Sequence, residues 1–287
     1  MKKRTIGIIL CLFLIVIGII VNALYISPSK IAVRFETLES TEIPSSLDGV
    51  SIVFFSDLHF NGFVDQQRAQ IIFDIINELN ADVVLFGGDL LDHPATTALS
   101  EENQSYLIEA LASINAPLGK FAVYGNHDLE SNNAALLIET IYAESGFELL
   151  VNENVKIHNK TSSFINLIGI DSMALGEPNL ESSYENISPN SYTIALCHTP
   201  DIFDEISTDL TDLLLAGHSH GGQIYLPFFG AMYLPEGAQN YVQGKYYIDD
   251  TTLDITNGVG TTKEDIRLFA PAEIVHYTLK SISDEDV

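Results

Sequence analysis

Basic residues are scarce in this sequence, and their scarcity disfavours whole classes of partner. Of 287 residues, 13 are lysine or arginine and 39 are aspartate or glutamate, which gives a formal net charge of −26. A broad nucleic-acid-binding surface needs clustered lysine and arginine to neutralise phosphates, so we expect no nucleic-acid partner. The same balance argues against docking on anionic lipid by electrostatics alone.

Cysteine is also scarce. Cys11 lies in an N-terminal apolar run and Cys197 in an expected buried strand, so a disulfide between them is not expected. Extracellular domains of this size often lack disulfides, and the cysteine count therefore leaves the compartment open. The sequence holds no internal repeat and no low-complexity tract. Its 46% of hydrophobic residues are sufficient for one large core after the N-terminal segment.

One long hydrophobic run occurs, at the N-terminus. Basic residues at positions 2–4 precede an apolar stretch from Ile6 to Ile26, which as a helix spans about 30 Å, the hydrocarbon thickness of a bilayer. We therefore predict a single-pass anchor over residues 1–26 in the cell membrane, with the N-terminus cytoplasmic and the rest of the chain outside. The alternative is secretion after signal-peptide cleavage, because Val21-Asn22-Ala23 roughly fits the pattern before a cleavage site. The stretch is long for a signal peptide, so we prefer the anchor.

Apolar strands and amphipathic helices alternate after a linker and edge strand at residues 27–47. This alternation predicts one α/β domain over residues 48–280, followed by an acidic tail at 281–287. The expected helices are 65–79, 100–114 and 133–145. The expected strands are 50–55, 82–86, 121–124, 164–171, 192–197 and 213–216, with further strand signals at 246–248, 253–256 and 274–279.

Side chains suited to metal binding follow these strands directly. Ligands of α/β sheets bind at the carboxyl ends of strands, so we expect these residues to gather along one edge. Residues two apart in an extended segment point to the same side, which lets each pair aim at one place. Five of the eight histidines fall in five motifs, which are Asp57-x-His59, Gly88-Asp89-x-x-Asp92, Gly125-Asn126-His127-Asp128, His198 and Gly217-His218-x-His220.

The five motifs, in this order, resemble those of the calcineurin-like metallophosphoesterases over about residues 48–280. Within that superfamily the sequence looks most like the membrane-anchored or exported bacterial phosphodiesterases. This closer likeness rests on Gly217–Gln223 followed by Leu226-Pro227, and on Asn257–Gly260 with Arg267 and Pro271–Glu273. The resemblance implies a four-layer α-β-β-α sandwich, with residues 48–280 as its catalytic domain.

A site for two divalent metal ions is also implied by the resemblance. One metal would be held by Asp57, His59 and His220, the other by Asn126, His198 and His218, with Asp89 bridging both. The catalytic histidine would be His127, oriented by Asp92. A hydroxide that bridges two metals is a nucleophile at neutral pH and can attack phosphorus while a histidine protonates the leaving oxygen. The donor set contains no thiolate, which suits Mn, Fe or catalytic Zn without deciding among them.

We therefore predict a phosphoesterase that hydrolyses a phosphoester or pyrophosphate bond. The anchor alone favours a lipid-linked or envelope-derived substrate. His93 stands where protein Ser/Thr phosphatases of the superfamily carry arginine, which argues against a protein phosphatase. The alternatives are a nuclease, which the acidic charge opposes, and a non-catalytic metal-binding scaffold, which the complete ligand set opposes. Substrate and oligomeric state are left open.

Other residues have two interpretations at this level. Arg267 either contacts substrate phosphate or forms a structural salt bridge. The aromatic run from Tyr225 to Tyr233 is interpreted as a packed loop in preference to the border of an apolar pocket. Asp128 is expected to serve the following helix or loop, and His158 and His276 to lie on strand surfaces.

Overall fold

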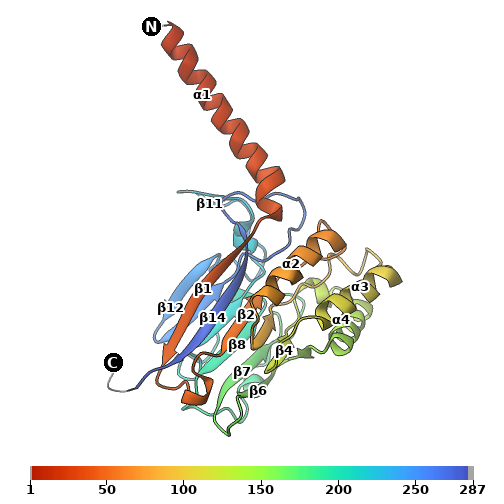
Figure 1. The fold of residues 1–287 in the computed structure, drawn as a ribbon, viewed down its shortest axis with the longest axis vertical. Helices are drawn as coiled ribbons and strands as arrows, with labels where there is room; N and C mark the ends of the chain where they lie inside the picture. The colour runs from red at the N-terminus through yellow and green to blue at the C-terminus, as the bar shows by residue number, and fades with distance from the viewer. Residues whose placement is uncertain (1, 284–287) are drawn as a thin grey trace.

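Two six-stranded sheets form the centre of the molecule (Figure 1). The computed structural model describes residues 2–283, so positions 284–287 of the expected acidic tail lie outside the described residues. The first sheet has the order β1 (Ile31–Ser40), β14 (Ala272–Ser281), β2 (Ser51–Phe55), β3 (Val83–Phe86), β4 (Gly119–Ala122) and β5 (Glu148–Leu149). The second has the order β12 (Gly244–Ile248), β13 (Thr251–Ile255), β9 (Leu213–Ala216), β8 (Thr193–Cys197), β7 (Phe164–Ile170) and β6 (Glu153–His158).

Successive residues of the central strands face different cores. In β2, Ile52 and Phe54 belong to the core between the two sheets, whereas Val53 and Phe55 belong to the core under the helices. A strand buried on both faces needs apolar residues at every position, which is why these segments read as continuous apolar runs. Strands β2, β3, β4 and β5 are parallel, and so are β7, β8, β9 and β13.

Helices cover the outer faces of both sheets. Three of them, α2 (Gln66–Glu78), α3 (Glu101–Ala112) and α4 (Asn132–Ser145), pack on the first sheet. The second sheet is covered by the short helices α5 (Leu180–Ser183) and η5 (Pro200–Asp204). The expected four-layer α-β-β-α sandwich is confirmed, with a fourth layer made of short helices and loops.

Capping residues define the helix ends. Asp65 and Ser100 precede α2 and α3, and each side chain accepts a hydrogen bond from a first-turn backbone N–H. Gly146 follows α4 with a left-handed φ of +77°, which ends the helix. The three helices begin and end within two residues of the expected bounds. Strand β4 ends at Ala122, two residues earlier than expected.

The N-terminal helix projects away from the domain (Figure 1). It consists of α1 (Lys2–Val21), a π-helical stretch η1 (Asn22–Ile26) and a 3-10 turn η2 (Ser27–Ser29). The segment Arg4–Ser29 is a candidate membrane span by length and composition. Only its last part touches the domain, because Ala23 and Pro28 are buried whereas most of α1 is exposed.

An ion pair joins the two sheets at one edge. The Arg34 guanidinium on β1 donates to both carboxylate oxygens of Asp254 on β13, at 2.9 and 2.7 Å. The Tyr277 hydroxyl on β14 donates to the same carboxylate at 2.7 Å. Asp254 is fully buried, so its charge depends on these partners.

We predict that Arg34→Leu lowers the free energy of unfolding by about 2–3 kcal/mol, because it removes both guanidinium hydrogen bonds to the buried Asp254 carboxylate and leaves it the more distant Lys245 ammonium, at 4.0 Å. The loss is smaller than for a fully enclosed pair because the Arg34 side chain is 26% exposed. Urea denaturation of the full chain in detergent measures it. The control is Lys280→Ala, which breaks an exposed pair with Glu39 and should change stability by less than about 0.5 kcal/mol. Equal effects of the two changes would contradict the role of the pair.

Candidate metal centre

The predicted ligands come together from both sheets at the carboxyl ends of their strands. Asp57 and His59 follow β2, and Asp89 follows β3. The other predicted residues come from the loops after β4, β8 and β9, and they are Asn126, His127, His198, His218 and His220. Of the four groups of potential ligand atoms among the described residues, two consist of predicted ligands alone, one from Asp57, His59 and His220 and the other from Asp89, His198 and His218. The other two both contain His127, one with His59 and Asp92 and the other with His93 and Glu130.

The atoms of the first group face one another at short distances. His59 Nε2 lies 3.1 Å from His220 Nε2. His220 Nε2 in turn lies 3.5 Å from Asp57 Oδ1. These side chains are buried, so the facing nitrogen and oxygen atoms are shielded from water.

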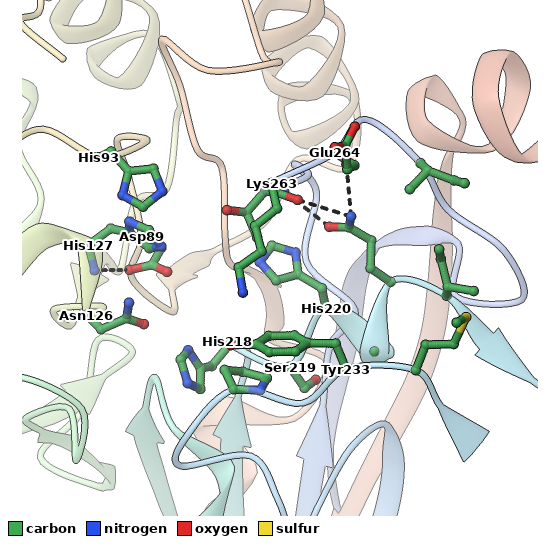
Figure 2. Close-up of a pocket in the computed structure, with 17 residues that line it drawn as sticks. Asp89, His93, Asn126, His127, His218, Ser219, His220, Tyr233, Lys263 and Glu264 are labelled. Carbon is green, nitrogen blue, oxygen red and sulfur yellow. Dashed lines mark hydrogen bonds between the residues drawn. The ribbon is translucent and has the colours of Figure 1, made fainter. Parts of the chain in front are cut away.

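Asp89 lies between this group and the second one. Its Oδ2 is 3.2 Å from His198 Nε2 and 3.6 Å from His59 Nε2, so one oxygen faces both groups. His198 Nε2 is also 3.0 Å from His218 Nδ1. The other carboxylate oxygen of Asp89 accepts the backbone N–H of His127 at 2.8 Å, a bond that Figure 2 shows.

Hydrogen bonds on the remote side of two rings fix which nitrogen is free. The Nδ1 atom of His198 lies 2.7 Å from the Gly87 carbonyl oxygen, and Nε2 of His218 lies 2.7 Å from the Glu236 carbonyl oxygen. A carbonyl only accepts, so these nitrogens donate, and in the neutral form of each ring the inward nitrogen carries the lone pair that a cation needs. Within residues 2–283, the buried Oδ1 of Asn126 and Nδ1 of His220 have no hydrogen-bond partner. The donor set therefore fits cations.

The backbone is strained where these side chains begin. Five of the seven predicted ligands have left-handed φ values between +48° and +66°, namely Asp57, His59, Asp89, His218 and His220. Non-glycine residues rarely adopt this conformation, and it is concentrated at functional sites. Gly125 allows a close approach, because a Cβ at that position would lie 2.1 Å from Asp89 Oδ1.

Asp128 connects two of the ligand loops. Its buried carboxylate accepts the backbone N–H groups of Asp89 at 2.9 Å, Leu90 at 3.0 Å and Gly125 at 2.8 Å. The sequence interpretation gave Asp128 to the following helix or loop. Its partners instead belong to the loops after β3 and β4, so it positions Asp89 from behind.

Charges in the site compensate one another. Burial alone would lower the pKa of His198, but the carboxylates of Asp89 and Asp57 raise it to about 9. Burial opposes ionisation of Asp89 as well, yet the neighbouring His198 and His127 hold its pKa well below the usual value. The carboxylates thus create a strong preference for positive charge at this place, which protons or metal cations satisfy.

The surroundings of Asp92 and His127 differ from the expectation. Asp92 Oδ1 lies 3.3 Å from Nδ1 of His59, whereas Nδ1 of His127 lies 2.8 Å from the carboxylate of Glu130. His127 opens the 3-10 turn His127–Leu129, which brings the carboxylate three residues later back to its ring. Glu130 is therefore the carboxylate in contact with the His127 ring, whereas Asp92 lies beside His59 and within 4.8 Å of ring nitrogens of both His59 and His127. The orientation of His127 by Asp92 stays a prediction. Glu130 also accepts from Nδ1 of His93 at 2.7 Å, a contact that the sequence gave no sign of.

Arg267 has neither of the roles considered from the sequence. It is completely buried, and its guanidinium donates to backbone carbonyls of Asn257, Gly258, Gly260 and Ala270. Within residues 2–283, no carboxylate forms an ion pair with it. The backbone N–H of Gly260 donates to the Asp57 carbonyl at 2.7 Å, so Arg267 fixes the loop that supports Asp57.

The aromatic run does not form the packed loop that the sequence favoured. It folds into a hairpin of β10 (Tyr225–Leu226) and β11 (Gly230–Ala231), and at its turn Phe228 is 103% exposed and Phe229 87% exposed. Outside the site, His158 lies exposed on β6 and His276 half-buried on β14.

A cavity of about 510 Å³ opens beside the ligands. At its polar end lie Asp89, Asn126, His127, His218 and His220, which Figure 2 shows around one space. Its lining also includes the apolar side chains of Ile224, Met232, Tyr233, Pro235 and Ile266. The Lys263 ammonium stands 3.5 Å above the ring of Tyr233 at this opening.

Comparison with known proteins identifies the class. The family model described as calcineurin-like phosphoesterase matches residues 50–222. The metallophosphoesterase YkuE of Bacillus subtilis is 32% identical over 259 residues, which are 90% of this chain and 89% of that protein. The chain belongs to the calcineurin-like phosphoesterase family. It is therefore a metal-dependent phosphoesterase of a family that uses a binuclear divalent metal centre.

The chain is also similar to a protein named as transmembrane and to one solved structure. A transmembrane protein with metallophosphoesterase domain from Danio rerio is 28% identical over 252 residues, covering 83% of this chain and 55% of that protein. The crystal structure of a dimetal phosphatase from Danio rerio aligns with a TM-score of 0.46 at 10% identity, covering 74% of this chain and 88% of that one.

We predict that Arg267→Lys lowers the free energy of unfolding by about 2–4 kcal/mol, because a single ammonium cannot reach all the carbonyls that the guanidinium binds. The midpoint of urea unfolding measures the effect. Lys263→Arg, at an exposed position of the same segment, should leave the midpoint unchanged. An unchanged midpoint for Arg267→Lys would show that the carbonyl contacts contribute nothing.

Proposed function

We propose that seven side chains hold two divalent cations at this site and that the enzyme hydrolyses phosphoester or pyrophosphate bonds there. Asp57, His59 and His220 would hold one cation, Asn126, His198 and His218 the other, and Asp89 both. The observation that carries the proposal is the position of Asp89 Oδ2, within 3.6 Å of a ring nitrogen from each group. The unpartnered Oδ1 of Asn126 supports it. The mixed imidazole and oxygen donors suit Mn, Fe or Zn.

When bound, such a pair of cations activates water as a nucleophile at neutral pH and stabilises negative charge on the phosphoryl group. The protein residues bind, orient and protonate the substrate. His127 lines the cavity, and the contact of its Nδ1 with Glu130 leaves Nε2 to hold a proton for the departing ester oxygen. Burial lowers the pKa of His127, and the carboxylates of Asp89 and Glu130 oppose this effect. Glu130 thus orients the ring and favours its protonated form.

The anchor and the charge support a location and a substrate range. The basic residues before α1 favour a cytoplasmic N-terminus with the catalytic domain outside, and secretion after cleavage is the alternative. The net charge of −26 disfavours polynucleotides as substrates, because a negative surface repels polyanions. A non-catalytic scaffold would not need a complete ligand set aimed at one place, so hydrolysis is the function that the site supports best.

We predict that Asp89→Asn abolishes turnover of bis-p-nitrophenyl phosphate with Mn and reduces bound metal from two ions to one or none. An amide is neutral and loses the anionic oxygen that both cations would share. Metal content by mass spectrometry and rate are measured on the same sample. Asp48→Asn, an exposed carboxylate remote from the site, is the control. Normal activity together with two bound metals in Asp89→Asn would contradict the bridging role.

Glu130 and Asp92 contact different histidines, so we predict different effects when each carboxylate is replaced by an amide. Glu130→Gln should lower kcat about 10- to 100-fold while leaving metal content unchanged, because it contacts His127 and no predicted ligand. Asp92→Asn should weaken metal affinity about 10- to 100-fold, because it supports the ring of His59. Steady-state kinetics and metal titration distinguish them. The reverse assignment of the two effects would restore Asp92 as the partner of His127.

A further inference from the structure

The exposed hairpin lies beside the base of the N-terminal helix. In Figure 1, β11 is drawn next to the point where α1 reaches the domain, and the C-terminus lies at the opposite end. Backbone contacts connect the two features. The N–H of Arg267 donates to the carbonyl of Ala23 at 3.0 Å, and the next residue, Leu268, pairs with Ile224 at the start of the hairpin.

This connection fixes the level of the hairpin relative to a bilayer. The apolar run Ile6–Ile26 spans about 30 Å as a helix, which equals the hydrocarbon thickness. The end of this run, and whatever it contacts, therefore stands at the membrane interface. Exposed apolar side chains belong both to the end of the helix and to the hairpin region that the helix contacts. In the helix they are Leu24, Tyr25 and Ile26, and in and beside the hairpin they are Phe228, Phe229, Met232, Tyr233 and Phe269.

The chemistry of the hairpin suits a lipid interface. Aromatic rings at a loop tip partition into the region between headgroups and acyl chains. The net charge of −26 gives the domain no general electrostatic attraction to anionic lipid, so contact with the bilayer must come from apolar insertion next to the anchor. A hairpin fixed to the helix base needs no further attraction to reach the bilayer.

The same hairpin leads directly into the site. The predicted ligand His220 begins the turn His220–Gly222, and Gly222 packs against Ala231 of β11 so closely that a Cβ there would lie 2.3 Å from the alanine methyl. Met232 and Tyr233, which follow β11, line the same cavity as the candidate metal ligands. Figure 2 shows Tyr233 beside His218 and His220, so the segment after the hairpin forms part of the cavity wall.

We propose that the hairpin Tyr225–Tyr233 inserts into the interface of the bilayer that holds α1, so that the cavity opens at the membrane surface and accepts phosphoesters of membrane-embedded lipids. The inference rests on the proposed phosphoesterase function and adds the substrate class. In the reaction, water adds to phosphorus, one ester P–O bond breaks, and the leaving oxygen takes a proton. The phosphoryl group lies among the ligands while the acyl chains stay in the bilayer.

Tryptophan fluorescence tests insertion independently of activity. The chain contains no tryptophan, so Phe229→Trp in the full-length protein introduces a single probe. In phosphatidylcholine vesicles, brominated lipid should quench this probe strongly. Tyr247→Trp is the matched control, because Tyr247 is 70% exposed near the end of β12, which runs antiparallel to β13 and so away from the site. Equal quenching of the two probes would overturn the proposal. Protection of the Phe229→Trp probe from iodide without quenching by bromolipid would also overturn it, because it would indicate a protein partner or a second copy.

Matched substrates test the consequence for catalysis. Full-length protein with Mn is reconstituted in vesicles and assayed on phosphatidyl-p-nitrophenol and on soluble bis-p-nitrophenyl phosphate. Chromatography of the products detects hydrolysis of either ester bond of the lipid phosphodiester. Phe228→Ser/Phe229→Ser should lower kcat/KM for the lipid at least about tenfold, because partial burial of two phenyl rings is lost. The soluble ester should be hydrolysed within about twofold of the wild-type rate, since neither ring lines the cavity. Leu136→Ser/Tyr247→Ser, at two other exposed positions, should change neither rate.

The outcomes distinguish failure of the membrane-facing site from failure of the proposed phosphoesterase function. If the wild-type protein hydrolyses neither substrate, the phosphoesterase proposal fails. If it hydrolyses the soluble ester but not the lipid, or if the hairpin variant loses both activities equally, the proposal of a membrane-facing site fails and the phosphoesterase proposal stands.

Discussion

Burial of two carboxylates side by side is the constraint on which this structure depends. Asp57 is fully buried and Asp89 is 1% exposed. Within residues 2–283, their only ion-pair partners are the histidines His59, His198 and His220. A buried carboxylate without compensating charge is strongly destabilising, so the folded state favours whatever cation occupies this place. Cations that bind only the folded chain stabilise it by mass action, which links the chemistry of the site to the stability of the domain.

Much of the surrounding structure holds the metal-binding side chains in place although their backbone conformations are unfavourable. Left-handed backbone at Asp57 and Asp89 costs free energy that neighbouring contacts must offset. Asp128 supplies one such set of contacts by accepting three backbone N–H groups across two loops. Arg267 supplies another by binding five backbone carbonyls, one of which belongs to His220. Both residues are buried and touch the ligand loops through the backbone. Residues of this kind preorganise a site without contacting its substrate.

The sequence predicted the elements whose physics is local. Apolar runs indicate strands buried on both faces, and capping residues such as Ser100 mark helix starts, so the strands, the helices and the loops after each strand could be inferred. The four layers followed from the resemblance to the metallophosphoesterases. The residues within those loops could be named because their types suit cations. The partner of His127 could not be inferred, because it depends on a 3-10 turn that returns Glu130 to the ring instead of Asp92. The exposed hairpin was missed for a related reason: an aromatic run predicts burial unless a turn places its rings beyond the core.

Anchoring and surface charge act together on the choice of substrate. A domain with a net charge of −26 repels free polyanions, and this repulsion is strongest at low salt. Apolar contact between an aromatic hairpin and a bilayer does not depend on ionic strength in the same way. In the proposed arrangement, a phosphoester held in the plane of that bilayer would reach the cavity by lateral diffusion and would not need a long-range electrostatic field to collect it.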